Sequence, residues 1–156
     1  MIIEIPKLGP EGSDLAGEEP PAVLDLEPAA DVAAEGPLHY ALRAEVVSRE
    51  LLVRGRVDMR LRLRCARCAV LFSTTLSESR FLRAYPLHED EVEVDVTADL
   101  REALLLRLPS HPCCREDCAG LCARCGANRN EQPCTCAPAS GSPAWGALDG
   151  LEWDRS

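Results

Sequence analysis

The sequence contains few aromatic residues, few histidines and almost no lysine. Its 156 residues include two Trp, two Tyr, two Phe and three His, and Arg provides 16 of the 17 basic residues. A hydrophobic core must therefore be built from Leu, Val and Ala, and a bound metal would strengthen so thin a core. The histidines lie far apart in the sequence, without a serine or carboxylate partner at catalytic spacing. We therefore expect no catalytic residues.

Long apolar runs are also absent. No segment approaches the roughly 20 apolar residues of a transmembrane helix. The opening residues, MIIEIPKLGPEGSDLAGEEPP, lack the basic and apolar regions of a signal peptide. We therefore expect a cytoplasmic protein with no membrane contact, in a compartment that keeps thiols reduced.

Cysteine, in contrast, is abundant, with nine residues. Eight of them form four closely spaced pairs, and Cys113 is left over. Under reducing conditions such pairs are typical of metal ligands, and two pairs supply the four thiolates of a structural zinc site. We expect two zinc ions, with a single ion as the alternative, bound by Cys65, Cys68, Cys114, Cys118, Cys122, Cys125, Cys134 and Cys136.

The cysteine pairs can be combined in more than one way. The turn CARCG at 122–126, whose glycine relieves crowding around a metal, is expected to share an ion with 134–136. This leaves 65–68 to combine with 114–118. One zinc shared by 65–68 and 122–125 is the alternative. An iron–sulfur cluster and thiol–disulfide chemistry also stay open, although neither CxxC opens a helix within a βαβ unit, as a redox motif usually does.

Strand patterns dominate the middle of the sequence. Residues 51–64 alternate between apolar and mostly charged positions, and patterns over 38–47, 70–76 and 91–96 predict further strands, with a hairpin turn near 48–50. The expected fold class is α+β, mainly antiparallel β, as a sheet or a partly open barrel. One or two short helices and a cysteine-rich zinc-binding C-terminal segment complete it.

Helices are predicted at two places. Leucines recur at helical spacing over 100–108, with Thr97 or Asp99 as the cap and Pro109 as the end. A weaker helix follows Ser142. The chain is accordingly divided into an N-terminal strand (1–8), an acidic Pro/Ala-rich arm (9–37), a β-rich core (38–109), a cysteine-rich metal-binding segment (110–136) and a loose tail with a short helix (137–156).

Charge is segregated along the chain. The net charge is −9, but residues 39–83 carry +6, whereas residues 1–38 carry −8 and residues 84–156 carry −7. The planar guanidinium of arginine suits phosphate. The basic block therefore predicts an RNA-binding face that contains Arg54, Arg56, Arg60, Arg62, Arg64 and Arg67. The alternative is that carboxylates of the strand at 91–96 neutralise these arginines within the molecule.

Several of these features occur together in one known family. The CARC turn at 65–68, the acidic and valine-rich strand at 92–96, the helix that ends in Leu-Pro at 109, and the cysteine pattern over 111–136 together resemble the YceD family. The motif CGANRNEQPCTC is specific, and the ending PAWGALDGL also matches. The resemblance implies a bacterial or plastid ribosome-biogenesis factor, without a catalytic centre, that supports accumulation of large-subunit ribosomal RNA.

The expected function is therefore non-enzymatic. The protein would support accumulation or maturation of large-subunit (23S) ribosomal RNA by binding that rRNA, its precursor or a ribosomal protein, with no small-molecule substrate. The acidic segments would suit a basic ribosomal protein. The alternative is a thiol oxidoreductase or zinc-dependent enzyme that uses the CxxC pairs, although a catalytic zinc needs an open coordination position.

Overall fold

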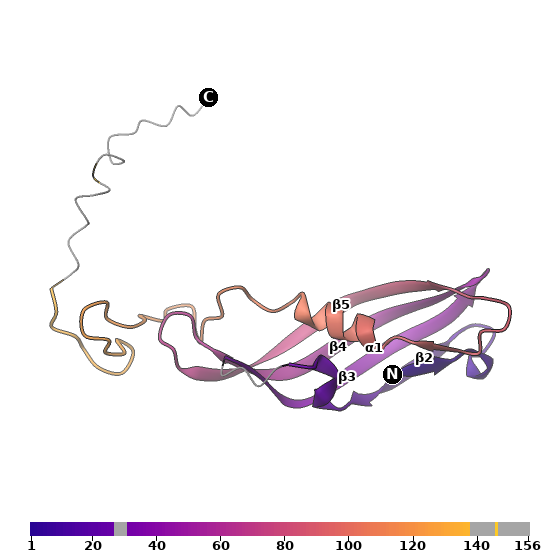
Figure 1. Ribbon diagram of the computed structural model, residues 1–156, viewed down its shortest axis with the longest axis horizontal. Helices are drawn as coiled ribbons and strands as arrows, with labels where there is room; N and C mark the ends of the chain where they lie inside the picture. The colour runs from indigo at the N-terminus through magenta and orange to yellow at the C-terminus, as the bar shows by residue number, and fades with distance from the viewer. Residues whose placement is uncertain (27–30, 138–145, 147–156) are drawn as a thin grey trace, which may run out of the picture.

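The computed structural model describes residues 1–26, 31–137 and 146. These residues form an elongated molecule built on long antiparallel strands (Figure 1). In chain order the elements are β1 (Ile2–Glu4), η1 (Ile5–Lys7), β2 (Ser13–Glu19), η2 (Pro21–Leu24), β3 (Val32–Val47), β4 (Glu50–Arg64), β5 (Leu71–Pro86), β6 (Glu93–Asp95) and α1 (Thr97–Leu105).

A four-stranded antiparallel sheet forms the body of the protein, in the order β2-β3-β4-β5. β3 and β4 are joined by a two-residue hairpin turn at the predicted place, and Ser48 in this turn has a φ of 59°. Within the described residues the sheet is open, because β2 and β5 each pair on one side, and no closed barrel forms. The fold class expected from the sequence is confirmed.

The alternation along β4 separates a buried face from an exposed one. Val53, Val57, Met59, Leu61 and Leu63 are at most 1% exposed and form the centre of the core. The intervening arginines lie on the opposite face. This arrangement follows from the period of two along a strand, which sends neighbouring side chains to opposite sides.

The short helix α1 covers the buried face of the sheet (Figure 1). Leu100 and Leu104, expected on the apolar stripe, are at most 1% exposed. The helix begins at Thr97, after the N-cap residue Val96, which offers no capping side chain, and the N–H of Thr97 donates to the carboxylate of Asp95 at 2.9 Å. Asp99 instead accepts hydrogen bonds from Tyr85 and Arg83 on β5, which fixes α1 against the sheet.

Residues 9–37 differ from the expected loose arm. They contain β2, which pairs with β3, the turn η2, and the start of β3. Leu24 is 1% exposed in the core, and its carbonyl accepts a hydrogen bond from Arg101 of α1. The expectation failed because the apolar residues of this segment are sparse, so its order comes from contacts with distant elements and not from a local pattern.

The acidic strand pairs with a different partner from the one considered. β6 pairs with β1 in a separate two-stranded sheet and does not lie against β4.

Within the described residues no helix is long and apolar enough to span a membrane. The helix predicted after Ser142 lies outside the described residues.

Candidate metal centres

The first four-cysteine group lies at the tip of the β4–β5 hairpin and is here named the hairpin site. Cys65 and Cys68 come from the turn, and Cys114 and Cys118 from the segment after α1. Their Sγ atoms lie within 4.8 Å of one another, with 3.9 Å between Cys65 and Cys118 and 3.7 Å between Cys68 and Cys114. Cys65, Cys68 and Cys118 are at most 5% exposed, so the site ties the hairpin tip to the later segment in a buried setting.

The second group, here named the loop site, comprises Cys122, Cys125, Cys134 and Cys136. The Sγ of Cys134 lies 3.5 Å from that of Cys125 and 3.3 Å from that of Cys122. Gly126 has a φ of +73°, and an added Cβ would meet nothing within 4 Å. The left-handed backbone is therefore one reason for a glycine here, and relief of crowding around a bound metal stays a prediction.

Backbone N–H groups point at the sulfur atoms in both sites. In three cysteine pairs the N–H two residues after the first cysteine lies 3.4 Å from its Sγ, namely Arg67 to Cys65, Arg124 to Cys122 and Cys136 to Cys134. Cys65 also accepts from the N–H of Cys114 at 3.4 Å. Donors arranged in this way stabilise a negatively charged sulfur.

These hydrogen bonds favour the thiolate form of the first cysteine in each CxxC turn. Burial raises the pKa of Cys65, but the N–H groups of Cys114, Cys68 and Arg67 outweigh it and lower that pKa to about 6. The N–H groups of Cys125 and Arg124 lower the pKa of Cys122 to about 6 as well. Because the thiolate is the metal-binding form, each site contains a sulfur ready to coordinate.

Both groups fit a single tetrahedral ion. Zinc–sulfur bonds of about 2.3 Å in a tetrahedron place the sulfurs about 3.8 Å apart, and the separations at the hairpin site are 3.7 and 3.9 Å. The loop-site separations of 3.3 and 3.5 Å are somewhat tighter. Either group could therefore hold a metal ion with all four positions filled by sulfur.

The geometry also bears on the other uses of the cysteines that the sequence left open. The single zinc shared by 65–68 and 122–125 is wrong in geometry, because these pairs lie in different groups. All nine cysteines are free, and the separations above are well beyond the roughly 2.05 Å of a disulfide bond. In a multinuclear iron–sulfur cluster the thiolates bind different irons, which requires a wider cage than one ion.

Two neighbouring residues stand apart from both groups. Cys113 belongs to neither cluster, and its thiol points to the carbonyl of His111 at 3.7 Å. Among the described residues the clusters contain cysteine alone, so His111 is not brought into either of them. Cys113, which had no closely spaced partner in the sequence, is therefore also outside both four-cysteine groups in the structure.

The five arginines of β4 form an exposed row that we name the arginine face: Arg54, Arg56, Arg60, Arg62 and Arg64. Four of them lie close to carboxylates, in the pairs Arg54–Glu45 (3.5 Å), Arg56–Asp58 (2.9 Å), Arg60–Glu35 (3.3 Å) and Arg64–Asp31 (2.5 Å). None of these acids comes from residues 91–96. Neutralisation by β6 is therefore wrong, and acids within and beside β3 and β4 take that role.

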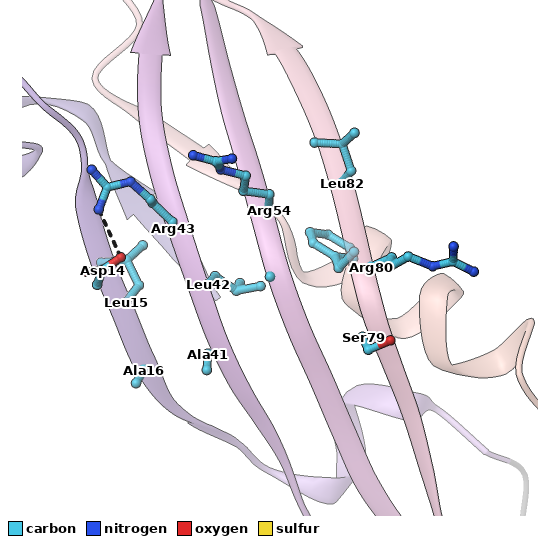
Figure 2. Close-up of a pocket in the computed structure, with 12 residues that line it drawn as sticks. Asp14, Leu15, Ala16, Ala41, Leu42, Arg43, Arg54, Ser79, Arg80 and Leu82 are labelled. Atoms are coloured by element: carbon cyan, nitrogen blue, oxygen red, sulfur yellow. Dashed lines mark hydrogen bonds and ion pairs between the residues drawn. The ribbon is translucent and has the colours of Figure 1, made fainter.

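A shallow depression of about 620 Å³ lies on the same side of the sheet. Figure 2 shows Arg43 and Arg54 side by side above it, with Arg43 joined to Asp14 of β2.

Arg67, which was expected on or near the arginine face, lies instead at the hairpin site. Its guanidinium donates to the carbonyl of Cys118 at 3.2 Å and so supports the hairpin site.

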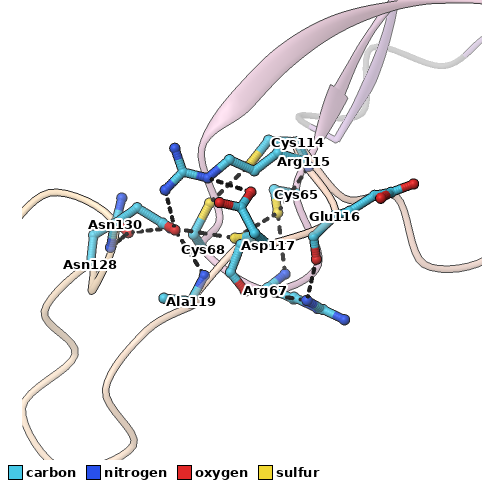
Figure 3. A network of polar contacts seen from close by, with 11 residues as sticks. Cys65, Arg67, Cys68, Cys114, Arg115, Glu116, Asp117, Ala119, Asn128 and Asn130 are labelled. Atoms are coloured by element: carbon cyan, nitrogen blue, oxygen red, sulfur yellow. Dashed lines mark hydrogen bonds and ion pairs between the residues drawn. The ribbon is translucent and has the colours of Figure 1, made fainter.

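Sequence reasoning missed the role of two asparagines. From the sequence alone, Asn128 and Asn130 would be expected only to form a turn. In the structure the side-chain amide of Asn130 donates to the Sγ of Cys118 at 3.3 Å and to Oδ1 of Asn128 at 2.8 Å. Figure 3 shows this amide beside the hairpin site. The available signal was their position within the motif GANRN, between two cysteine pairs.

Fold and sites together define an open antiparallel β protein with two four-cysteine groups of metal-binding geometry. Residues 82–152 match the family described as large ribosomal RNA subunit accumulation protein YceD. The match begins within β5 and includes α1 and every cysteine from Cys113 to Cys136. This part of the chain, slightly less than half of it, is therefore similar to the YceD family.

Curated relatives come from bacteria and a plant. A Mycobacterium leprae protein named as uncharacterized is 36% identical over 114 residues, 62% of this chain and 51% of its own length. A Mycobacterium tuberculosis protein, also named as uncharacterized, is 38% identical over 113 residues, 62% of this chain and 53% of its own. The chain thus spans about half the length of these mycobacterial relatives.

A plant relative has a more informative name. The Arabidopsis thaliana protein named large ribosomal RNA subunit accumulation protein YCED homolog 1, chloroplastic, is 30% identical over 59 residues. The aligned part is 38% of this chain and 18% of that protein. No solved structure matches.

Proposed function

We propose that this protein is a non-enzymatic factor that supports accumulation or maturation of large-subunit ribosomal RNA. The observation that carries the proposal is the YceD family match over residues 82–152, which contains α1 and six of the eight clustered cysteines. The name of the plant relative refers to the same process. Action in the cytoplasm agrees with reduced thiols.

The two cysteine groups support a structural role for bound zinc. Four thiolates around one tetrahedral ion leave no position for a substrate or an activated water, in contrast to catalytic zinc. A structural zinc site contributes an apparent ~10–16 kcal/mol in small domains. We therefore assign to zinc the stabilisation of the hairpin tip and of the irregular segment that follows α1.

The arginine face is the proposed contact for ribosomal RNA. Its ion pairs lie at the surface, where each is worth about 0–1 kcal/mol. Phosphate can replace such carboxylates at low cost, and the pairs meanwhile hold the guanidinium groups in a row along β4. Arg62 has no ion-pair partner within the described part of the chain, which makes it the first contact to test.

RNA binding can be tested with two variants of equal charge change. Arg60→Ser/Arg62→Ser removes two charges from the arginine face, whereas Lys7→Ser/Arg49→Ser removes two exposed charges elsewhere. On a single-stranded rRNA fragment each lost phosphate contact should reduce the log–log salt slope by about 0.7. We expect a reduction of about 1.4 for the first variant alone. Equal slopes for both variants would remove the arginine face from the proposal.

A basic ribosomal protein is the second candidate partner, favoured by the net charge of −8 on residues 1–38. The matched variant here is Glu11→Gln/Glu18→Gln, because deletion of residues 9–37 would remove β2 from the sheet. Loss of a ribosomal protein in pull-downs, with RNA retained, would identify that partner. The rRNA role itself is tested in cells that lack the gene, by measuring mature and precursor 23S rRNA with and without the restored protein.

A further inference from the structure

The loop site and the hairpin site are connected through one side chain. Asn130 lies between Cys125 and Cys134 in the sequence and therefore belongs to the loop closed by the loop site. Its amide nitrogen nevertheless donates to the Sγ of Cys118, a member of the hairpin site, at 3.3 Å. A residue ordered by one candidate metal centre thus contacts a ligand of the other.

The orientation of this amide is fixed by its remaining hydrogen bonds. The Oδ1 atom of Asn130 accepts from the N–H of Ala119 and from the guanidinium of Arg115, each at 2.8 Å. Its Nδ2 also donates to Oδ1 of Asn128 at 2.8 Å. These contacts satisfy both ends of the amide and aim one N–H at the sulfur (Figure 3).

Backbone contacts hold the loop against the hairpin turn. The N–H of Leu121 donates to the carbonyl of Arg67 at 3.0 Å, and the N–H of Arg129 donates to the carbonyl of Gly120 at 2.9 Å. Leu121 and Asn128 form an isolated antiparallel bridge. The path from the CxxC turn of the hairpin site to Asn130 is therefore continuous.

The loop has few other sources of order. Leu121, Arg124 and Arg129 are exposed, and the loop contributes no residue to the hydrophobic core. Four thiolates bound to one ion would supply the order that burial does not, because they close the eight residues between Cys125 and Cys134.

We propose that the two sites bind metal cooperatively, with Asn130 as the positioning residue that transmits the effect. A metal in the loop site orders the loop and presents the Asn130 amide to the thiolate of Cys118, which strengthens the hairpin site. Contacts of this kind behind a metal ligand change metal affinity by about 10–100-fold. By linkage, a metal in the hairpin site strengthens the loop site by the same factor. The proposal rests on metal binding at both sites and not on the rRNA role.

The test is a metal titration of the full chain, freed of metal under anaerobic conditions. Zinc affinity is measured by competition with a chelator, and Co²⁺ serves as a spectroscopic probe of tetrahedral thiolate sites. In Cys122→Ser/Cys125→Ser, which disables the loop site, we expect the affinity of the hairpin site to fall about 10–100-fold. Asn130→Ala should produce a similar fall with the loop-site cysteines intact, and should shift the Co²⁺–thiolate charge-transfer band.

Combining the changes gives the decisive comparison. Asn130→Ala should cost the hairpin site little more once the loop site is already disabled, because both changes remove the same contact. Asn130→Asp, which keeps the acceptor oxygen but faces Cys118 with a carboxylate, should weaken the site at least as much as Asn130→Ala. Cys113→Ser is the control, because Cys113 belongs to neither group, and it should leave both affinities unchanged.

Several results would overturn the proposal. One is a hairpin-site affinity within twofold of the parent when the loop site is disabled. Another is a fully additive effect of Asn130→Ala in the combined variant. Binding of fewer than two ions per chain would also end it. Because none of these measurements involves RNA, they separate this proposal from the proposed function.

Discussion

Gly55 provides a quantitative test of how β4 is held in the sheet. Its φ is +151°, and a Cβ built on it would lie 2.2 Å from the carbonyl oxygen of Ala41 and 2.8 Å from the Cα of Leu42. A register shift in the β4–β5 pairing occurs at the same place, between Gly55 and Val57. An alanine here would thus meet both backbone strain and the backbone of β3, which cannot move away without disturbing its pairing with β2.

The expected cost of Gly55→Ala follows from these two terms. A sparsely populated backbone conformation costs about 1–3 kcal/mol, and a Cβ forced into a packed site costs about 1–3 kcal/mol more. We therefore expect the free energy of unfolding in urea to fall by about 2–6 kcal/mol. Gly36→Ala is the matched control, since a Cβ there meets nothing within 4 Å, and it should be neutral or slightly stabilising. With the metal content equal in both variants, a difference below about 0.5 kcal/mol would refute this reasoning.

Three further predictions concern metal and hydrogen bonds. A chelator should remove about two ions per chain, the loop site emptying first because Cys125 and Cys136 are exposed, as metal analysis over time would show. The N–H of Arg80 and the guanidinium of Arg107 lower the pKa of Glu78, so its stabilisation should hold above the ordinary glutamate range and disappear as pH falls below it. Urea titrations from pH 6 to 3 should show this loss in the parent but not in Glu78→Gln. Tyr85→Phe should cost about 1.5 kcal/mol by removing the hydrogen bond to Asp99, measured by urea unfolding.

The close cysteine pairs were predictable because they depend on local spacing. Two cysteines separated by one to three residues lie on one turn, whatever the rest of the chain does. How the pairs combine depends on the fold, and the structure places the eight cysteines in one of the two combinations that the sequence left open. Which residues support the ligands was not predictable in the same way. Asn130 contacts Cys118 across 12 positions of chain, and only the folded loop brings them together.

The strands also differ in whether a local sequence pattern predicts them. β4 and the apolar side of α1 could be predicted because their apolar residues repeat at the period of a strand and of a helix. β2 was missed because its exposed positions are acidic or small and few of its side chains are apolar, so the pairing with β3 supplies its order. The fold of residues 9–37 is thus determined by its neighbours more than by its own sequence.

The arginine face shows why charge along a sequence is a weaker predictor than cysteine spacing. Residues 39–83 carry +6, yet four of the five arginines on β4 have a carboxylate within 3.5 Å. Two of these acids, Asp31 and Glu35, lie in the segment counted as an acidic arm, and folding brings them onto the basic strand. Two closely spaced cysteines stay close together wherever the chain places them, whereas the effect of an arginine row on phosphate depends on the carboxylates that folding brings beside it. The salt dependence of RNA binding by Arg60→Ser/Arg62→Ser therefore measures a property of the folded face that no count of charges along the chain can provide.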